Sequence, residues 1–388
     1  MSDISCILIV LIVIAAIVSS GCTQPVTPPQ QAGGMGPNPP PEETRAALQQ
    51  IMHAGIHTTG IPGVVMDIAT PKWTWNSAAG NASPITCEKA QPGMRFLIAS
   101  VSKTFTSVAV QKLAEEKKLS LDDPIARWLP ADLVEKIPNG RIITVRQLLD
   151  HTSGIADYEE DSIIIREYQN PDVPVTYQTA MWQGINASPL YPPGTNFTYS
   201  NVNYILLTLI IDNASGVPYE NFVTRNIFVP AGMNDTFIQE TNHIPGPHMT
   251  ATQRGGNGMF ADLSGLYVQF DRGAGDIVST TADLNRFHRA LREGKLISKS
   301  SFAAMEIPSP QSGSMSYGLG YMNGFDAASN VTTQGHSGGY PGSFTFLDYL
   351  PEQDTYVAMN MNSADISTDN LKKIRTALLT YLKNGTYQ

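Results

Sequence analysis

The stretch FLIASVSKTFT, residues 96–106, is the most informative part of the chain. An apolar, strand-like run ends at Ala99, and the pattern predicts a helix from about 101 to 118. Residues three apart share a face in a first helical turn, so Lys103 can approach the Ser100 hydroxyl. A serine hydroxyl needs a base beside it to act as a nucleophile, and lysine can serve once burial disfavours its ammonium form. The alternative is that Ser100 merely caps the helix and Lys103 is exposed.

A second candidate motif is Tyr199-Ser200-Asn201. Tyr-x-Asn occurs four times in the chain, so only the surroundings select this copy. A Pro-Gly turn at 192–195 precedes it, and an apolar helix is expected over 204–211. A tyrosine beside a lysine cation could titrate low enough to pass protons, and an asparagine amide can hold a carbonyl. The alternative is an ordinary loop tyrosine followed by a helix-capping asparagine.

The third motif is His336-Ser337-Gly338-Gly339, within QGHSGGYPG at 334–342. It leads into a strand-like run at 343–349. Glycines at such a place let a substrate lie against the strand backbone. The alternative is a glycine-rich hairpin turn with an incidental histidine.

Strand signals gather at the two ends of the folded region. Strands are expected at 63–69, 72–76, 343–349 and 355–359, and helices at 42–57, 280–293 and about 367–382. Thr280 or Thr281 caps the second of these helices. The middle, 120–275, reads as helices between Pro/Gly-rich loops. We therefore expect an α/β fold with one sheet built from both ends of the chain and a mainly helical subdomain inserted at about 115–275.

Composition excludes several classes of protein. Hydrophobic residues make up 42% of the 388 residues, which excludes a disordered chain. The net charge of −9 argues against nucleic acid as a partner. The three cysteines are too few for a disulfide framework. No metal or other cofactor is predicted, because His243 and His248 fall in a loop without companion ligands.

The first 22 residues read as a targeting segment. An unbroken apolar run at 7–18 is too short to span a bilayer but suits a signal peptide. It ends in Ser-Ser-Gly-Cys, which resembles the lipobox of prokaryotic lipoproteins and implies lipidation of Cys22. A proline-rich tether follows at 23–43, and the folded domain is expected over 44–388. We expect an extracytoplasmic protein tethered to the membrane by the lipid or an uncleaved anchor, or else secreted; seven Asn-x-Ser/Thr sequons agree with export.

The order of the three motifs resembles the penicillin-recognising serine hydrolases, which include class C β-lactamases and D-alanyl-D-alanine carboxypeptidases. Residues 96–106, QLLDHTSGI at 147–155 and the segment 191–201 are also similar to that family. The similarity covers about 44–385 and implies a β-lactamase-like fold, an antiparallel sheet flanked by helices. It also implies a role for each motif residue: Ser100 as the acylated nucleophile, Lys103 and Tyr199 as general base and acid, Asn201, His336, Ser337 and Gly338 as substrate-binding residues, the backbone N–H groups of Ser100 and Gly339 as the oxyanion hole, and His151 as structural.

One departure bears on the substrate. His336 stands where β-lactamases carry lysine, and matches the His-Thr-Gly type of DD-carboxypeptidase. Histidine supplies a cation for a substrate carboxylate only when protonated, with an ordinary pKa near ~6.5. We therefore expect an exported serine hydrolase, acting as a monomer on a small peptide, amide or ester through a Ser100 acyl-enzyme. It is most like a D-alanyl-D-alanine carboxypeptidase; an esterase, a β-lactamase and a non-catalytic binding or sensor lipoprotein are the alternatives.

Overall fold

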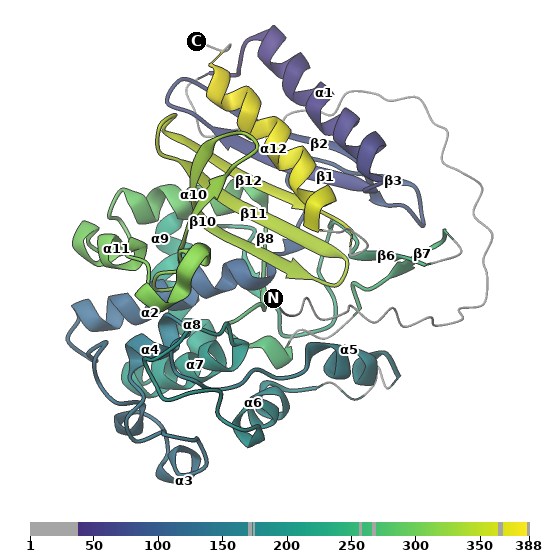
Figure 1. Cartoon of the computed structure of the whole chain (residues 1–388). Coiled ribbons are helices and arrows are strands. Elements are labelled where there is room, and N and C mark those ends of the chain that lie inside the picture. The colour runs from purple at the N-terminus through teal and green to yellow at the C-terminus, as the bar shows by residue number, and fades with distance from the viewer. Residues whose placement is uncertain are drawn as a thin grey trace.

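A seven-stranded antiparallel sheet joins the two ends of the chain (Figure 1). The computed structural model describes residues 38–385, except 170–172, 174, 256–257, 266–268 and 364–367. The strand order is β3-β2-β1-β12-β11-β10-β9, with β1 beside β12. The strands are β1 (Gly63–Ala69), β2 (Thr74–Ser83), β3 (Glu88–Lys89), β9 (Met322–Asp326), β10 (Val331–Tyr340), β11 (Ser343–Leu350) and β12 (Thr355–Met361). The predicted sheet built from both ends is thus confirmed. The predicted signal at 1–22 with Cys22 lipidation, and residues 23–37 of the tether predicted at 23–43, lie outside the described residues.

Helices cover both faces of this sheet. The helices α1 (Glu42–Thr59) and α12 (Thr368–Asn384) lie side by side over one face (Figure 1). Leu48, Met52 and Leu378 are buried between them and the strands. The helix α10 (Thr281–Arg292) packs against β1, β11 and β12, and the Thr280 side chain caps it by accepting from the Asp283 N–H. Within the described residues no helix is long and apolar enough to cross a membrane.

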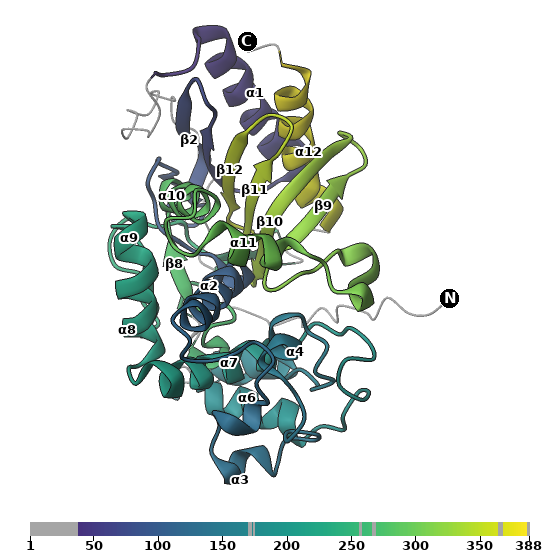
Figure 2. The same ribbon diagram turned by 90° about the vertical axis from the view of Figure 1, so that its left-hand side faces the viewer.

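A mainly helical part lies on the side of the sheet away from α1 and α12 (Figures 1 and 2). Its centre is α7 (Asn201–Ser215), which is buried from Val202 to Thr208 and packs against α2, α4 and α6. The remaining helices are α2 (Ser102–Glu115), α3 (Ala131–Val134), α4 (Val145–Leu149), α5 (Glu160–Gln169), α6 (Tyr177–Asn186), α8 (Tyr219–Val223), α9 (Val229–Ala231) and α11 (Lys299–Glu306). One core runs from this part to β10, so the two parts share a packed boundary.

The structure differs from the prediction in several strands. β2 runs on to Ser83 where a strand of only 72–76 was expected, because Ala78, Ala79 and Ala82 are buried although alanine favours strands weakly. The stretch expected to be helical also contains the short strands β5 (Phe237–Ile238), β6 (Thr252–Arg254) and β7 (Phe260–Asp262), and β4 (Phe96–Leu97) and β8 (Ile277–Ser279) pair beside it. Strands of two or three residues are too short to show the alternation of apolar and polar residues by which a strand is predicted. The glycine-rich third motif lies inside β10 and is not a turn.

Candidate active site

Ser100 lies in a tight turn that leads into α2. The turn is a 3-10 helix over Ala99–Val101, and Ala99 adopts a left-handed φ of 49°. Such a backbone is costly for a residue other than glycine and is kept where its surroundings enforce it. Ala99 and Val101 are buried, whereas Ser100 stays partly exposed. The side chain of Ser100 does not cap α2, so the capping alternative does not describe it.

Lys103 links the first two motifs. Its ammonium group donates to Ser100 Oγ at 3.0 Å, to Asn201 Oδ1 at 2.7 Å and to the carbonyl of Ala274 at 2.8 Å. Three acceptors satisfy all three N–H groups of a protonated lysine. Because the side chain is fully buried, this charge acts on every neighbouring titratable group with little screening.

Tyr199 flanks the same ammonium, with its ring centroid 4.9 Å from Lys103 Nζ. Burial raises the pKa of Tyr199, whereas the charge of Lys103 and hydrogen bonding with Lys103 and Ser100 lower it. Because the effect of burial is the largest, the pKa of Tyr199 lies above its ordinary value. The expectation that this tyrosine titrates low is therefore wrong, and it remains a neutral phenol.

His151 packs directly behind Tyr199, with ring centroids 4.3 Å apart. Its Nδ1 accepts from the Ser200 N–H at 3.2 Å, which fixes the loop that carries Tyr199. Burial, and then the charge of Lys103, lower the pKa of His151 well below its ordinary value. The described contacts of His151 hold the loop of Tyr199, and the ring that makes them is neutral.

His336 is also neutral. On β10 it is only 4% exposed. Its Nδ1 donates to the Ser337 carbonyl at 2.6 Å, so its Nε2 accepts from the Tyr317 hydroxyl at 3.2 Å. Burial, and then the charge of Lys103, lower the pKa of His336 to about 3. Its side chain therefore has no positive charge with which to bind a carboxylate at neutral pH.

The glycines of the third motif bring β10 against the Ser100 turn. A side chain at Gly338 would place its Cβ 2.2 Å from the Ile98 carbonyl oxygen and 2.8 Å from the Ser100 nitrogen. Only glycine permits this approach of β10 to the Ser100 turn, and Gly339, whose N–H was predicted to form the oxyanion hole with that of Ser100, follows directly in the chain. Ser337 is partly exposed at the same point. Pairing between β9 and β10 ends at Gly335, so the strand edge beyond it is not covered by β9.

Asp157 is a site residue that the sequence did not reveal. Its Oδ1 accepts from the backbone N–H groups of Asn201 and Val202, at 2.9 and 3.3 Å. Its Oδ2 accepts from Asn201 Nδ2 at 3.0 Å, which turns the Asn201 oxygen toward Lys103. Burial first, and then repulsion from the neighbouring Asp271, raise the pKa of Asp157 to about 6, although the hydrogen bond from the Asn201 N–H lowers it. The only sequence signal is its place six residues after His151.

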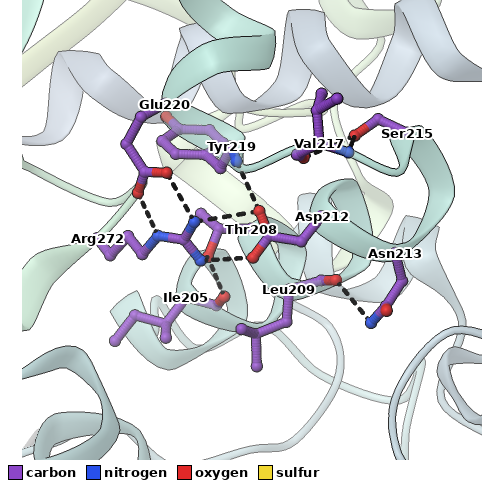
Figure 3. A network of polar contacts seen from close by, with 10 residues as sticks. All are labelled: Ile205, Thr208, Leu209, Asp212, Asn213, Ser215, Val217, Tyr219, Glu220 and Arg272. Atoms are coloured by element: carbon purple, nitrogen blue, oxygen red, sulfur yellow. Dashed lines mark hydrogen bonds and ion pairs between the residues drawn. The ribbon is translucent and has the colours of Figure 1, made fainter.

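Arg272 anchors the turn that supplies Ala274 to Lys103. Figure 3 shows its guanidinium group between Asp212 of α7 and Glu220 of α8. It contacts Asp212 Oδ2 at 2.8 Å and Glu220 Oε1 at 2.6 Å. Both carboxylates form ion pairs with this one guanidinium group. Arg272 therefore does not offset the negative charge of other carboxylates near the site.

The profile of the Beta-lactamase family matches residues 45–381. The chain belongs to this family. A penicillin-binding protein of Bacillus subtilis (strain 168) is 29% identical over 293 residues, which are 70% of this chain and 61% of the relative. The chain thus spans about three fifths of the length of that relative.

Solved structures of the family agree with the fold. The D-stereospecific amidohydrolase from a Streptomyces species is 30% identical, with a TM-score of 0.76 over 86% of this chain and 97% of its own. The D-amino acid amidase from Ochrobactrum anthropi is 23% identical, with a TM-score of 0.78 over 88% and 99%, and supports the fold alone. This β-lactamase-family chain is therefore a serine hydrolase of the superfamily that the three motifs predicted. Among its described residues no group of His, Cys, Asp and Glu could hold a metal ion.

Proposed function

We propose that the chain hydrolyses amides of D-amino acids through an acyl-enzyme on Ser100. The hydrogen bond of 3.0 Å between Lys103 and Ser100, beside a partly exposed hydroxyl, is the observation that carries this proposal. The amidohydrolase from Streptomyces, at 30% identity, supports the choice of amide and of the D configuration.

In the proposed reaction Lys103 first gives one proton to solvent. Ser100 Oγ then bonds to the substrate carbonyl carbon while its proton passes to the neutral Lys103 amine. The backbone N–H groups of Ser100 and Gly339 stabilise the oxyanion. The carbon–nitrogen bond then breaks, and the leaving amine takes a proton from Tyr199, whose raised pKa suits a neutral donor. Water hydrolyses the ester by the same steps in reverse order, releasing the acid and restoring Ser100.

The state of His336 favours an amide with no carboxylate in its leaving group. A D-alanyl-D-alanine carboxypeptidase has to bind a carboxylate next to the third motif, and so does a β-lactamase. Here Tyr317 occupies His336 Nε2, and the pKa of about 3 leaves the ring uncharged at neutral pH. Asn201 is held by Lys103 and Asp157, so in the proposed complex it presents its amide at the edge of the acyl group.

The test is hydrolysis of D-phenylalaninamide and L-phenylalaninamide, followed as ammonia release. We expect the D amide to be hydrolysed and the L amide to be inert, with no release by Ser100→Ala. Equal release from both amides would remove the claim of D specificity. Release by Ser100→Ala equal to that of the wild type would remove Ser100 from the reaction.

The second candidate is a D-alanyl-D-alanine carboxypeptidase. The Bacillus subtilis relative is named a penicillin-binding protein, which supports a site that binds penicillin. Intact mass after exposure to penicillin separates it from the others. A stable adduct on Ser100 supports the carboxypeptidase, and hydrolysed drug without an adduct supports a β-lactamase. Intact drug and no adduct, from a folded protein, leaves an amidase, an esterase or a non-catalytic binding lipoprotein, which the amide assay distinguishes.

We further propose that the enzyme works outside the cytoplasm, tethered through residues 1–43. The support is the apolar run at 7–18, the Ser-Ser-Gly-Cys sequence that ends at Cys22, and the proline-rich segment after it. We expect the full chain to sediment with membranes and Cys22→Ser to become soluble. Sedimentation of both would favour an uncleaved anchor, and sedimentation of neither would favour secretion.

A further inference from the structure

Tyr317 is a fully buried tyrosine that none of the three motifs includes. Its ring meets the His336 ring edge-on, with centroids 5.6 Å apart, and its hydroxyl donates to His336 Nε2 at 3.2 Å. Among the described residues the hydroxyl has one other hydrogen-bonding neighbour, the Tyr204 oxygen at 3.5 Å. Tyr204 donates its own proton to the Leu149 carbonyl at 2.8 Å. The nitrogen of His336 is therefore the acceptor that best fits the Tyr317 proton.

The position of Tyr317 is fixed through both its backbone and its ring. Its N–H donates to Ser312 Oγ at 3.1 Å, and its carbonyl accepts from the Ser309 N–H at 2.8 Å. The ring packs against three other rings, with centroids 4.8 Å from His151 and 5.9 Å from each of Phe197 and Tyr199. A ring packed on several sides keeps one rotamer, so the hydroxyl stays at His336 Nε2.

His336 has no carboxylate partner that would favour its charged form. In the described part of the chain no salt bridge includes it. Its Nδ1 is engaged by the Ser337 carbonyl at 2.6 Å, so both ring nitrogens have partners. Arg292 contacts Gln334 on the same strand, but it is already paired with Glu306 at 3.0 Å. Neither His336 nor Arg292 thus offers a free positive charge to an arriving carboxylate.

A substrate carboxylate would have to displace the Tyr317 hydroxyl from His336. The Nε2 atom can donate to a carboxylate only after it takes up a proton, and it then no longer accepts from Tyr317. The buried hydroxyl would keep only its contact of 3.5 Å with Tyr204, and a buried donor without a good acceptor is costly. An uncharged leaving group requires neither the proton nor the displacement, so Tyr317 favours it before any substrate binds.

We propose that Tyr317 determines the specificity for the leaving group, because it holds His336 as a neutral acceptor and so disfavours substrates whose leaving group carries a carboxylate. This inference rests on the proposed function and narrows its substrate class to primary amides and C-terminally blocked peptides of D-amino acids. Tyr199, the proposed proton donor to the leaving amine, packs against the Tyr317 ring, which brings the leaving group near the Tyr317–His336 pair. Tyr317 is a positioning residue, since it acts through His336.

The experiment compares D-phenylalanyl-D-alanine with D-phenylalanyl-D-alaninamide, which differ only in the carboxylate of the leaving group. Release of D-phenylalanine measures cleavage of the bond that both share, and the ratio of the two kcat/KM values is the preference. We expect the unmodified enzyme to prefer the amide by at least about tenfold. Tyr317→Phe should lower this preference by about threefold to tenfold, as the loss of one hydrogen bond allows.

Two further variants separate this role from a structural one. The matched control is Tyr204→Phe, which removes an equally buried hydroxyl that has no contact with His336 among the described residues and should leave the preference unchanged. Tyr317→Phe combined with His336→Gln should show the preference of His336→Gln alone, because Tyr317 acts through that ring.

Equal loss of activity toward both substrates in Tyr317→Phe would leave the preference intact and overturn the proposal. If Tyr317→Phe does not fold, nitrogen NMR of the histidines in the unmodified enzyme at pH 7 decides, with His336→Gln for the assignment. A neutral His336 ring with its proton on Nδ1 supports the proposal, and a charged ring or a proton on Nε2 overturns it.

Failure of the proposed function is scored separately. If the unmodified enzyme cleaves neither these two substrates nor D-phenylalaninamide, the proposed function fails. The affinities of the same two probes for Ser100→Ala, with and without Tyr317→Phe, then test Tyr317 by calorimetry. A preference for the amide that falls with Tyr317→Phe supports its role, and equal affinities for the two probes overturn it.

Discussion

The two sides of Lys103 differ in charge. On one side His151, His336 and Tyr317 are uncharged, because burial and the ammonium group itself keep both histidines deprotonated. On the other side lie three carboxyl groups, those of Asp157, Glu160 and Asp271. The lesson is that a motif histidine does not by itself supply a cation: burial first, and then the charge of a buried lysine, keep it neutral.

The largest expected effect comes from removing the ammonium between the two sides. Lys103→Met should lower kcat/KM for the amide by about 10²–10⁴-fold, the usual range for a general base or acid. It also leaves the Ala274 carbonyl and the Asn201 oxygen without their donor. The matched control is Lys112→Met on the same helix, whose ammonium meets only the Leu296 carbonyl among its described contacts, at 3.3 Å. Similar kinetics for the two variants would contradict the central place of Lys103.

The stability of the fold around the acidic side should depend on Arg272, which anchors the neighbouring turn. Arg272→Leu leaves Asp212 and Glu220 uncompensated, and removing one partner of a buried pair costs about 3 kcal/mol of unfolding free energy. Arg141→Leu is the control, because its pair with Glu135 is exposed and should be worth less than about 1 kcal/mol. Urea denaturation measures both. Equal losses would mean that Arg272 does not hold the turn.

The stability that the neutral side contributes should be lost as the pH falls. The folded pKa of His336 lies below the unfolded value, so its contribution to stability is complete above about pH 6.5 and is lost as the pH falls toward 3. In that window it adds up to about 1.4 kcal/mol per pH unit. His336→Gln should therefore have a flatter stability profile between pH 3 and 6.5. An unchanged slope would show that the ring is not held neutral.

The acidic side should titrate in the opposite direction, with a smaller effect because Glu160 is partly exposed. Its folded pKa of about 7 exceeds the ordinary value, so its contribution is complete below about pH 4.5 and is lost as the pH rises through 7. Glu160→Gln should reduce the fall in unfolding free energy between pH 5 and 8, with Glu159→Gln as control. A steeper fall in Glu160→Gln would reverse the sign assigned here.

Much of this site could be predicted from the sequence because its parts are local. Ser100 and Lys103 share one helical turn, and Tyr199 and Asn201 flank the start of one apolar helix. The charge state of His336 could not be predicted, since it depends on Tyr317 and on burial against Lys103, which come from distant segments. Asp157, Glu160 and Asp271 were missed for the same reason: acids scattered along a chain give no pattern until the fold gathers them.

The fold likewise has parts that the sequence predicted and parts that it did not. The outer helices and β1, β11 and β12 have clear apolar periods, and the sequence predicted them. β10 was not predicted as a strand because its glycines resemble a turn, yet Gly338 is there so that the strand can pass within contact of Ser100. A glycine selected for close approach cannot be distinguished by sequence alone from one selected for a turn.

The most direct test of the account is the intact mass of the enzyme during turnover of D-phenylalanine methyl ester, quenched in acid at short times. The ester has a better leaving group than an amide, so the acyl-enzyme should accumulate. We predict a D-phenylalanyl adduct that peptide mapping assigns to Ser100 and that Ser100→Ala lacks. Turnover of the ester with no adduct at any time, or an adduct on another residue, would contradict the account.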